Sequence, residues 1–384
     1  MAGPAFPPEE FAARLANVRM AMAAAELDGL VLGVPENIYY LTGLDHWGYF
    51  ACHLLIVPAE GELILIARAM ERITIDNQVH NARFLGHRDD EDIVDFVDQA
   101  VQALGLANRR LGYEERSLFI TPRIADGMRA VCPRATWWPA SGLVDGLRLT
   151  QSPLEIVYTR AAARAADAGT MAAIEAIHDG ASDRAIAAAC HAAMITAGSD
   201  YPGFGPFIRP TTRLGEEHTT WCGDVMRRGD AVFLELAAAC RRYHAPMGRL
   251  IYVGDAPAGA ADAAALAVEG MAAICSAIRP GVRAGDVYAA WHAVAASAGL
   301  TDYHRHHCGY LVGIAFPPSW TGGSSVTGLA PHAEFPLKPG MVFHAHSWFT
   351  GTHLANYFIS NTVLLGETGA EVLTSATPQG LTLR

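Results

Sequence analysis

The chain has 384 residues, a formal net charge of -11, 51% hydrophobic residues and 17% charged residues, which predicts a globular protein of two domains or one large domain. Its negative net charge argues against a nucleic-acid partner, because it repels the negatively charged phosphate backbone. The apolar runs are interrupted by charge, the first 20 residues lack a signal-peptide core, and the seven cysteines form no CxxC pair. We therefore expect no membrane partner and a cytoplasmic protein with reduced thiols.

The first third of the chain alternates helical and strand patterns. We expect helices over 11–26 and 93–104, strands over 28–34 and 110–113, and a hairpin of strands over 53–58 and 61–67. Alternation of this kind is typical of an α/β layer domain. The sequence therefore predicts a small N-terminal α/β domain over residues 1–150.

A helix start marks the domain junction. Ser152 is a good N-cap, Pro153 suits the first helical position, and Glu155 lies three residues after the cap. An Ala-rich helix should follow over 155–177. We place the boundary just before this cap, so the second domain is expected over 151–384.

The second domain groups helices between pairs of strands. Helices are expected over 182–197, 261–278 and 284–299, and strands over 231–236, 249–253, 341–348 and 357–365. The strands 231–236 and 249–253 should face each other across a turn. This arrangement indicates an α+β domain.

The histidines of the chain are unevenly distributed, while common catalytic motifs such as GxGxxG, the P-loop, HExxH and GxSxG are missing. A single histidine usually has only a structural role. Two of them differ, because His344 and His346 alternate within the apolar run 342–349 and so share one face of a strand. A polar pair on a strand face needs either water or a functional cleft.

Three segments resemble the creatinase and aminopeptidase P family. They are DAVFLELAAACRRYHAPMGRLIYVG (230–254), KPGMVFHA (338–345) and the domain-joining segment 143–163. Within that family, PENIYYLTGLDHWGY (35–49), EHTTW (217–221), GYLVGIAFPPSW (309–320) and YHAP (243–246) resemble the creatinase and ectoine hydrolase branch. The resemblance implies an α+β, pita-bread C-terminal domain. It also implies a homodimer, because the turn 47–50 resembles the segment that, in this family, reaches over the cleft of the partner subunit.

The chain departs from this family at the positions that bind two divalent ions in its peptidases. Those positions hold Glu235, Pro246, Tyr310, His346 and Ser360. Proline has no side-chain ligand, and un-ionised tyrosine and serine are poor ligands for hard divalent ions. One carboxylate cannot neutralise two adjacent dications. We therefore expect no metal and no other cofactor.

The resemblance assigns His218 to the position of the family's proton-shuttling histidine, where imidazole can activate water and then protonate a leaving nitrogen. Glu235 could orient His218 or bind a cationic substrate, or instead form a structural ion pair with Arg249. Tyr310, between Gly309 and Gly313, could donate a hydrogen bond to an oxyanion or simply pack as an aromatic side chain. With His346, these are the expected catalytic residues.

Further polar residues are expected to bind substrate. In the second domain these are His244, His344, His353, Arg249 and Asn361, the last of which replaces the glutamate of the ISET motif usual in ectoine hydrolases. In the first domain, Trp47 could stack on a planar cation and Arg68 could contact a substrate carboxylate. Purely structural roles are the alternative for both.

The leading interpretation is a metal-independent hydrolase that cleaves a C–N bond of a small amidine, guanidine or amide. A second is a one-metal lyase or oxygenase, with Glu235, His346 and one of His244, His344 or His353 as a two-histidine, one-carboxylate ligand set. A third is a non-catalytic protein that binds a small molecule.

Overall fold

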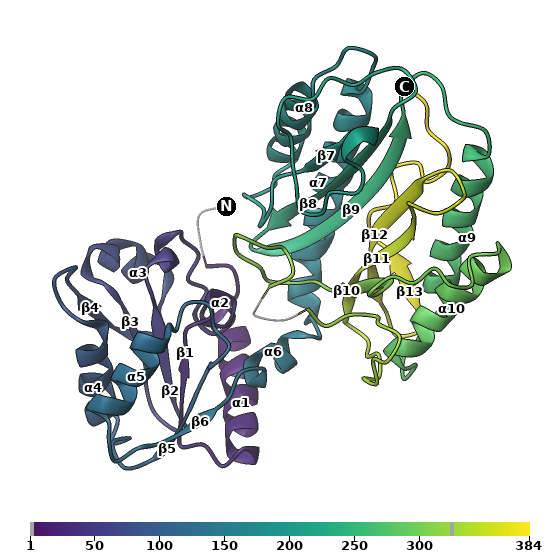
Figure 1. Cartoon of the computed structure of the whole chain (residues 1–384). Coiled ribbons are helices and arrows are strands. Elements are labelled where there is room, and N and C mark those ends of the chain that lie inside the picture. The colour runs from purple at the N-terminus through teal and green to yellow at the C-terminus, as the bar shows by residue number, and fades with distance from the viewer. Residues whose placement is uncertain (1–3, 323–325) are drawn as a thin grey trace. The chain divides into compact units, whose positions relative to one another are not determined.

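The computed structural model describes residues 4–322 and 326–384, which form two compact units that divide between Arg148 and Leu149. The N-terminal unit has one six-stranded sheet in the order β4-β3-β2-β1-β5-β6 (Figure 1). Its strands are β1 (Gly29–Leu32), β2 (Leu54–Pro58), β3 (Leu63–Arg68), β4 (Ala82–His87), β5 (Arg110–Tyr113) and β6 (Thr136–Pro139). Its helices are α1 (Pro8–Ala24), α2 (Pro35–Thr42), α3 (Arg72–Gln78), α4 (Ile93–Ala103), α5 (Pro122–Val131) and α6 (Leu143–Arg148).

The sheet of the N-terminal unit mixes both strand directions. β2 pairs with β1 and with β3 in antiparallel fashion, whereas β4 pairs with β3, β5 with β1, and β6 with β5 in parallel. The expected hairpin is therefore present as β2 and β3. Helix α2 was not anticipated. The strand expected over 28–34 ends just before Pro35, and proline is favoured at the first position of a helix.

The C-terminal unit has a seven-stranded sheet in the order β10-β11-β12-β9-β8-β7, with β13 paired to β12. Its strands are β7 (Phe207–Arg209), β8 (Ala231–Cys240), β9 (Tyr243–Tyr252), β10 (Gly309–Leu311), β11 (Val342–Phe349), β12 (Tyr357–Leu365) and β13 (Ala370–Val372). Its helices are α7 (Pro153–Ala176), α8 (Asp183–Thr196), α9 (Ala260–Ala277) and α10 (Ala284–Ser297).

Two helix pairs cover the sheet of the C-terminal unit. α7 and α8 contact each other and α7 lies on β8 and β9, while α9 contacts α10 and lies on β11 and β12 (Figure 1). Among the described residues, α9 alone has the length and apolar composition of a membrane span. Its buried positions, such as Ala263, Ala267 and Ile274, recur at helical spacing and pack into the core of the unit.

The hairpin of β8 and β9 sets the geometry of the site. It turns on Arg241 and Arg242, both with positive φ, and continues for ten residues on each side. Glu235 lies opposite Gly248, and Arg249 lies opposite Leu234. Glu235 and Arg249 therefore point to opposite faces of the sheet, so the ion pair considered between them is wrong.

The capping box at the start of α7 is present. The Ser152 hydroxyl accepts from the Glu155 backbone N–H at 3.3 Å, and the Glu155 carboxylate accepts from the Ser152 backbone N–H at 2.7 Å. The other oxygen of Glu155 accepts from the Tyr243 hydroxyl at 2.6 Å, which ties this helix end to β9.

We predict that Ser152→Ala lowers the free energy of unfolding by about 1 kcal/mol, because an N–H at the helix start loses its acceptor. Urea unfolding followed by circular dichroism measures this change. Ser297→Ala, at the end of α10, serves as the control and should change the value much less. Equal effects of the two substitutions would contradict a capping role for Ser152.

Candidate active site

The C-terminal unit contains a cavity of about 440 Å³. All four residues expected to be catalytic, His218, Glu235, Tyr310 and His346, line it. Aromatic and charged side chains make up most of the remaining wall: Phe204, Phe207, Arg209, Glu217, Arg305, His306, His307, Ser319, Trp320, Thr321, Val326 and Trp348. The sheet thus brings together residues that lie far apart in the sequence.

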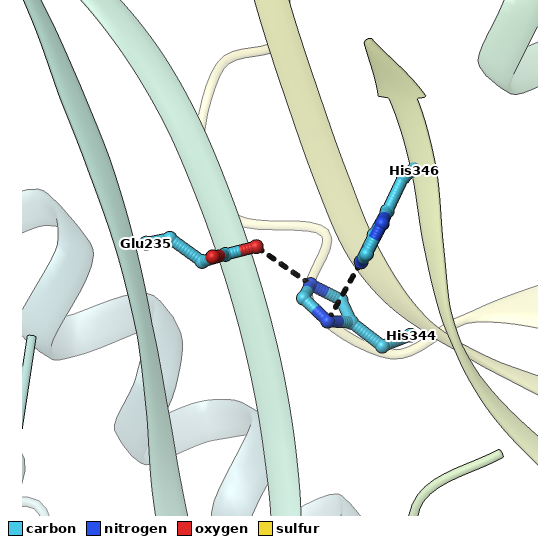
Figure 2. Close-up of side chains that lie close together, drawn as sticks. All are labelled: Glu235, His344 and His346. Carbon is cyan, nitrogen blue, oxygen red and sulfur yellow. Dashed lines mark hydrogen bonds and ion pairs between the residues drawn. The ribbon is translucent and has the colours of Figure 1, made fainter. Parts of the chain in front are cut away.

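His344 is fully buried behind this wall and joins the polar groups of the site. Its Nδ1 lies 2.9 Å from the Tyr310 hydroxyl and 2.9 Å from Nε2 of His346. Its Nε2 lies 2.8 Å from the Ser360 hydroxyl and 3.8 Å from the Glu235 carboxylate. Figure 2 shows Glu235, from β8, pointing toward the two histidines, which project from β11. His344 and His346 share a strand face, as expected from their spacing.

Burial controls the charge of these groups. Desolvation raises the pKa of Glu235 to about 8, although the nearby Arg209 guanidinium acts in the opposite direction. Burial also lowers the pKa of His344 and of His346 well below the usual value, and neighbouring histidines add to the effect. At neutral pH, Glu235 is therefore largely protonated and both imidazoles are neutral.

Tyr310 is held by two neighbours. Its hydroxyl accepts a hydrogen bond from Trp320 Nε1 at 2.8 Å and lies within bonding distance of His344. Burial raises its pKa well above the usual value, so the phenol stays neutral. Tyr310 is thus both packed in the wall and hydrogen-bonded, and its hydroxyl faces Nδ1 of His344.

His218 lies on an exposed loop at the mouth of the cavity. Its φ of 54° is in the left-handed region, which is strained for a residue with a side chain. Its ring lies 6.0 Å from that of Phe207 and 6.3 Å from that of Phe204. The end of the loop is anchored by the buried Asp183 carboxylate, which accepts from the backbone N–H groups of residues 222, 223 and 224.

The donor set does not fit a two-metal centre. Pro246 lies on β9 and uses its carbonyl to accept from Thr362 Oγ1 at 2.7 Å. Of the five positions that correspond to the family's ligands, Glu235 alone has a carboxylate, and Tyr310 and Ser360 are hydrogen-bonded to His344. Two adjacent dications would lack the negative charge that they require.

Three residues expected to bind substrate lie elsewhere in the C-terminal unit. The Arg249 guanidinium is buried and donates to Asn361 Oδ1 at 3.0 Å and to several backbone carbonyls, so both side chains have a structural function. His244 is fully buried, where its Nε2 accepts from Gly203 N and its Nδ1 faces the Arg242 carbonyl. None of the three lines the cavity. The strand pleat points Arg249 and Asn361 to the opposite face of the sheet from Glu235 and His346, whereas His244 shares the face of Glu235 but lies close to the β8–β9 turn.

Three more expectations fall outside the cavity wall. His353 is exposed in the loop before β12 and does not line the cavity, since the loop follows the end of β11. In the N-terminal unit, Trp47 is 55% exposed, and Arg68 pairs with Asp89 at 2.8 Å and lies over the Phe50 ring. The expected homodimer, which rests on the turn around Trp47, stays a prediction.

Sequence reasoning missed two arginines of the cavity, Arg209 and Arg305. Arg209 lies on the three-residue strand β7, which is flanked by prolines and reads as a loop in the sequence. The Arg305 guanidinium stacks over Trp348 at 4.2 Å and lies 3.9 Å from the Glu217 carboxylate. The one available signal for Arg305 was its place within the histidine-rich run 304–307.

Comparison with known proteins agrees with this architecture. Residues 158–367 match metallopeptidase family M24, and residues 14–150 match the creatinase/prolidase N-terminal domain. An ectoine hydrolase from Halomonas elongata is 28% identical, with 96% of each chain covered. A Xaa-Pro dipeptidase from Pyrococcus furiosus is also 28% identical, over 94% of this chain and 97% of the relative.

The solved structure of a Xaa-Pro dipeptidase from Bacillus anthracis has the same fold. Its TM-score is 0.85 at 21% identity, and the match covers 97% of this chain and 100% of the other. The expected fold class, a pita-bread C-terminal domain with a smaller N-terminal α/β domain, is therefore confirmed. The chain belongs to metallopeptidase family M24, as a hydrolase with a creatinase/prolidase N-terminal domain.

Proposed function

We propose that the chain is a metal-independent hydrolase that cleaves a non-peptide C–N bond in a small amidine, guanidine or amide. The observation that carries this proposal is the hydrogen-bonded set around His344. Tyr310, His346 and Ser360, three of the positions corresponding to family metal ligands, contact one imidazole and satisfy its two nitrogens. The relative named an ectoine hydrolase supports the substrate class, since ectoine is a cyclic amidine.

His218 acts as the acid and base in the proposed reaction. Its imidazole removes a proton from water, and the resulting hydroxide attacks the carbon of the C–N bond. The protonated ring then donates that proton to the leaving nitrogen, which returns His218 to its starting state. The exposed loop position gives His218 access to water at the cavity mouth.

Glu235 and the buried histidines provide the electrostatic environment. The carboxyl group of Glu235 is protonated in the free site at neutral pH, so it can donate a hydrogen bond to the intermediate. A cationic substrate beside it would favour the ionised form instead. Tyr310 orients His344 through its hydroxyl, and His344 in turn fixes the ring of His346.

A one-metal enzyme is the second candidate function. Glu235, His344 and His346 each offer one ligand atom, and these atoms lie within 4.8 Å of one another. Two imidazoles and a carboxylate form a ligand set that suits several first-row transition metals. This arrangement selects His344 rather than His244 or His353 as the second histidine of the alternative ligand set.

We predict that the purified protein contains no stoichiometric Mn, Co, Zn or Fe and that a chelator leaves its hydrolytic activity unchanged. Elemental analysis and assays with and without chelator measure these properties, using ectoine, creatine and a Xaa-Pro dipeptide as substrates. One tightly bound metal per chain, together with activity that the chelator removes, would favour the one-metal candidate. Turnover restricted to the dipeptide would contradict the proposed substrate class.

We predict that His218→Ala lowers kcat by about 10²- to 10⁴-fold, because general acid and base assistance is lost. Glu235→Gln should raise KM more than it lowers kcat if the carboxylate faces a cation. His332→Ala, at an exposed position outside the cavity, is the control and should leave kcat unchanged. If His218→Ala kept its kcat while His346→Ala abolished activity, the acid and base would have to be sought on β11.

We predict a distinct pH dependence of stability from Glu235. The folded pKa of about 8 exceeds the usual value of about 4.3, so the folded chain binds this proton more tightly. The contribution to stability is present below about pH 4.3 and is lost as pH rises through about 8. The melting temperature of Glu235→Gln, relative to wild type, should therefore rise across this range. Glu269→Gln, an exposed change on α9, is the control, and a matching curve for both variants would contradict a buried, protonated Glu235.

A further inference from the structure

Three largely buried histidines of the N-terminal unit lie at one end of strands β2, β3 and β4. His53 directly precedes β2, His87 ends β4, and His46 lies in the loop after α2. The rings of His46 and His53 are stacked, with their centroids 4.9 Å apart and 12° between their planes. His53 is 3% exposed and His87 is 9% exposed. We call these three side chains the histidine cluster.

The histidine cluster contains buried nitrogen atoms that the protein does not satisfy. The Nε2 atom of each ring is buried and has no hydrogen-bond partner among residues 4–322 and 326–384. The other ring nitrogen of His87 lies 3.0 Å from the carbonyl oxygen of Arg88. A buried polar atom without a partner is costly, so the closed form of this region gains little stability from its imidazoles.

His46 connects the cluster to the turn that follows it. The Gly48 N–H donates to Nδ1 of His46 at 3.2 Å, and the Glu71 carboxylate lies 3.3 Å from the same nitrogen. A neutral imidazole accepts from Gly48 through the lone pair of Nδ1. When a proton adds to that nitrogen, it becomes a donor to Glu71, and the Gly48 N–H loses its acceptor. The turn around Gly48 therefore depends on a hydrogen bond that a proton breaks.

His53 lies among groups that oppose its protonation. Burial lowers the pKa of His53 to about 3, and His46, His87 and the Arg68 guanidinium act in the same direction. Arg68 is brought here by β3, where it pairs in register with His87. A positive charge on His53 would therefore be both desolvated and repelled.

The carboxylates near the cluster favour a charge on His46 instead. Burial lowers the pKa of His46, although the Glu71 and Asp45 carboxylates act in the opposite direction. The other charged groups around the cluster are paired with one another: Arg68 with Asp89 at 2.8 Å, Arg88 with Asp90 at 2.9 Å, and Asp92, which acts on His87 from the start of α4, with Arg123 at 2.8 Å. A first proton on His46 thus has a partner, and a second proton on His53 has none.

We propose that the histidine cluster is an acid-sensitive switch whose protonation releases the segment 46–53 from the end of the sheet. The first proton binds Nδ1 of His46, where Glu71 accepts the hydrogen bond. A second proton would create two stacked cations beside Arg68, and this repulsion is relieved when His53 leaves its buried position.

Opening would move two exposed aromatic side chains that the segment carries. Trp47 is 55% exposed and Phe50 is 74% exposed, so the switch changes the apolar surface that this unit presents to solvent. The inference concerns the N-terminal unit alone and does not depend on the proposed hydrolase reaction.

The direction of the pH effect follows from the difference between the two forms. In the open segment an imidazole has its ordinary pKa of about 6.5, whereas burial lowers the pKa of His53 in the closed form to about 3. The closed form is therefore fully stable above about pH 6.5 and loses stability as pH falls below that value. Uptake of one proton on opening raises the opening equilibrium constant by about tenfold per pH unit, and uptake of two raises it by about 100-fold.

Hydrogen exchange read by mass spectrometry tests this proposal on the full chain. Peptides that cover 46–53 report the opening of the segment, and peptides from β5 and β6, at the other edge of the sheet, report wider unfolding. The measurement runs from about pH 7.5 to about pH 4.5, with rates corrected for the intrinsic pH dependence of exchange. The variants are His53→Phe, Glu71→Gln and, as the control, His80→Gln at an exposed position of the same unit.

We expect the protection of 46–53 in the wild type to fall by at least about 100-fold between about pH 6.5 and about pH 4.5, and to return when the sample is brought back to neutral pH. His53→Phe keeps an aromatic ring in the stack but binds no proton, so its loss should be at least about tenfold smaller. Glu71→Gln should show a larger loss than the wild type, because the charge on His46 loses its partner. His80→Gln should behave as the wild type does.

Three results would overturn the proposal. The first is protection of 46–53 that does not change with pH, and the second is an equal loss in the wild type and His53→Phe. The third is an equal and simultaneous loss in β5 and β6, or a loss that neutral pH does not reverse, because either would indicate acid unfolding of the whole unit. If His53→Phe does not fold, the comparison of Glu71→Gln with the wild type decides, and an equal loss in these two proteins overturns the assignment of the first proton to His46.

Discussion

The complete burial of His344 is the constraint on which the rest of the site depends. An imidazole removed from water needs partners for both ring nitrogens, and here they come from different strands. Tyr310 is on β10, His346 on β11, Ser360 on β12 and Glu235 on β8. A slip of one residue in any of these strands would turn its side chain to the opposite face. The register of these four strands is therefore constrained by the contacts of one imidazole ring.

The same burial determines which chemistry is available. A site that places Glu235 and two histidines out of water favours the neutral form of each, and the shifts in their pKa values have this direction. The single exposed imidazole of the proposed set is His218, on a strained loop outside the sheet. The buried groups Glu235, His344 and His346 are neutral, and His218 is exposed to water at the cavity mouth. This arrangement suits hydrolysis with His218 as the base.

Local patterns in the sequence were sufficient for much of the fold and part of the site. The alternation of His344 and His346, the apolar strand around Glu235 and the capping box at Ser152 each depend on residues close in the chain. The ion pair considered between Glu235 and Arg249 was wrong, because the pairing register of two strands does not follow from residues close together in the chain. The β8–β9 turn consists of Arg241 and Arg242 with positive φ, where asparagine and glycine are the usual residues. Without that turn signal, the positions that face each other on the two strands could not be predicted.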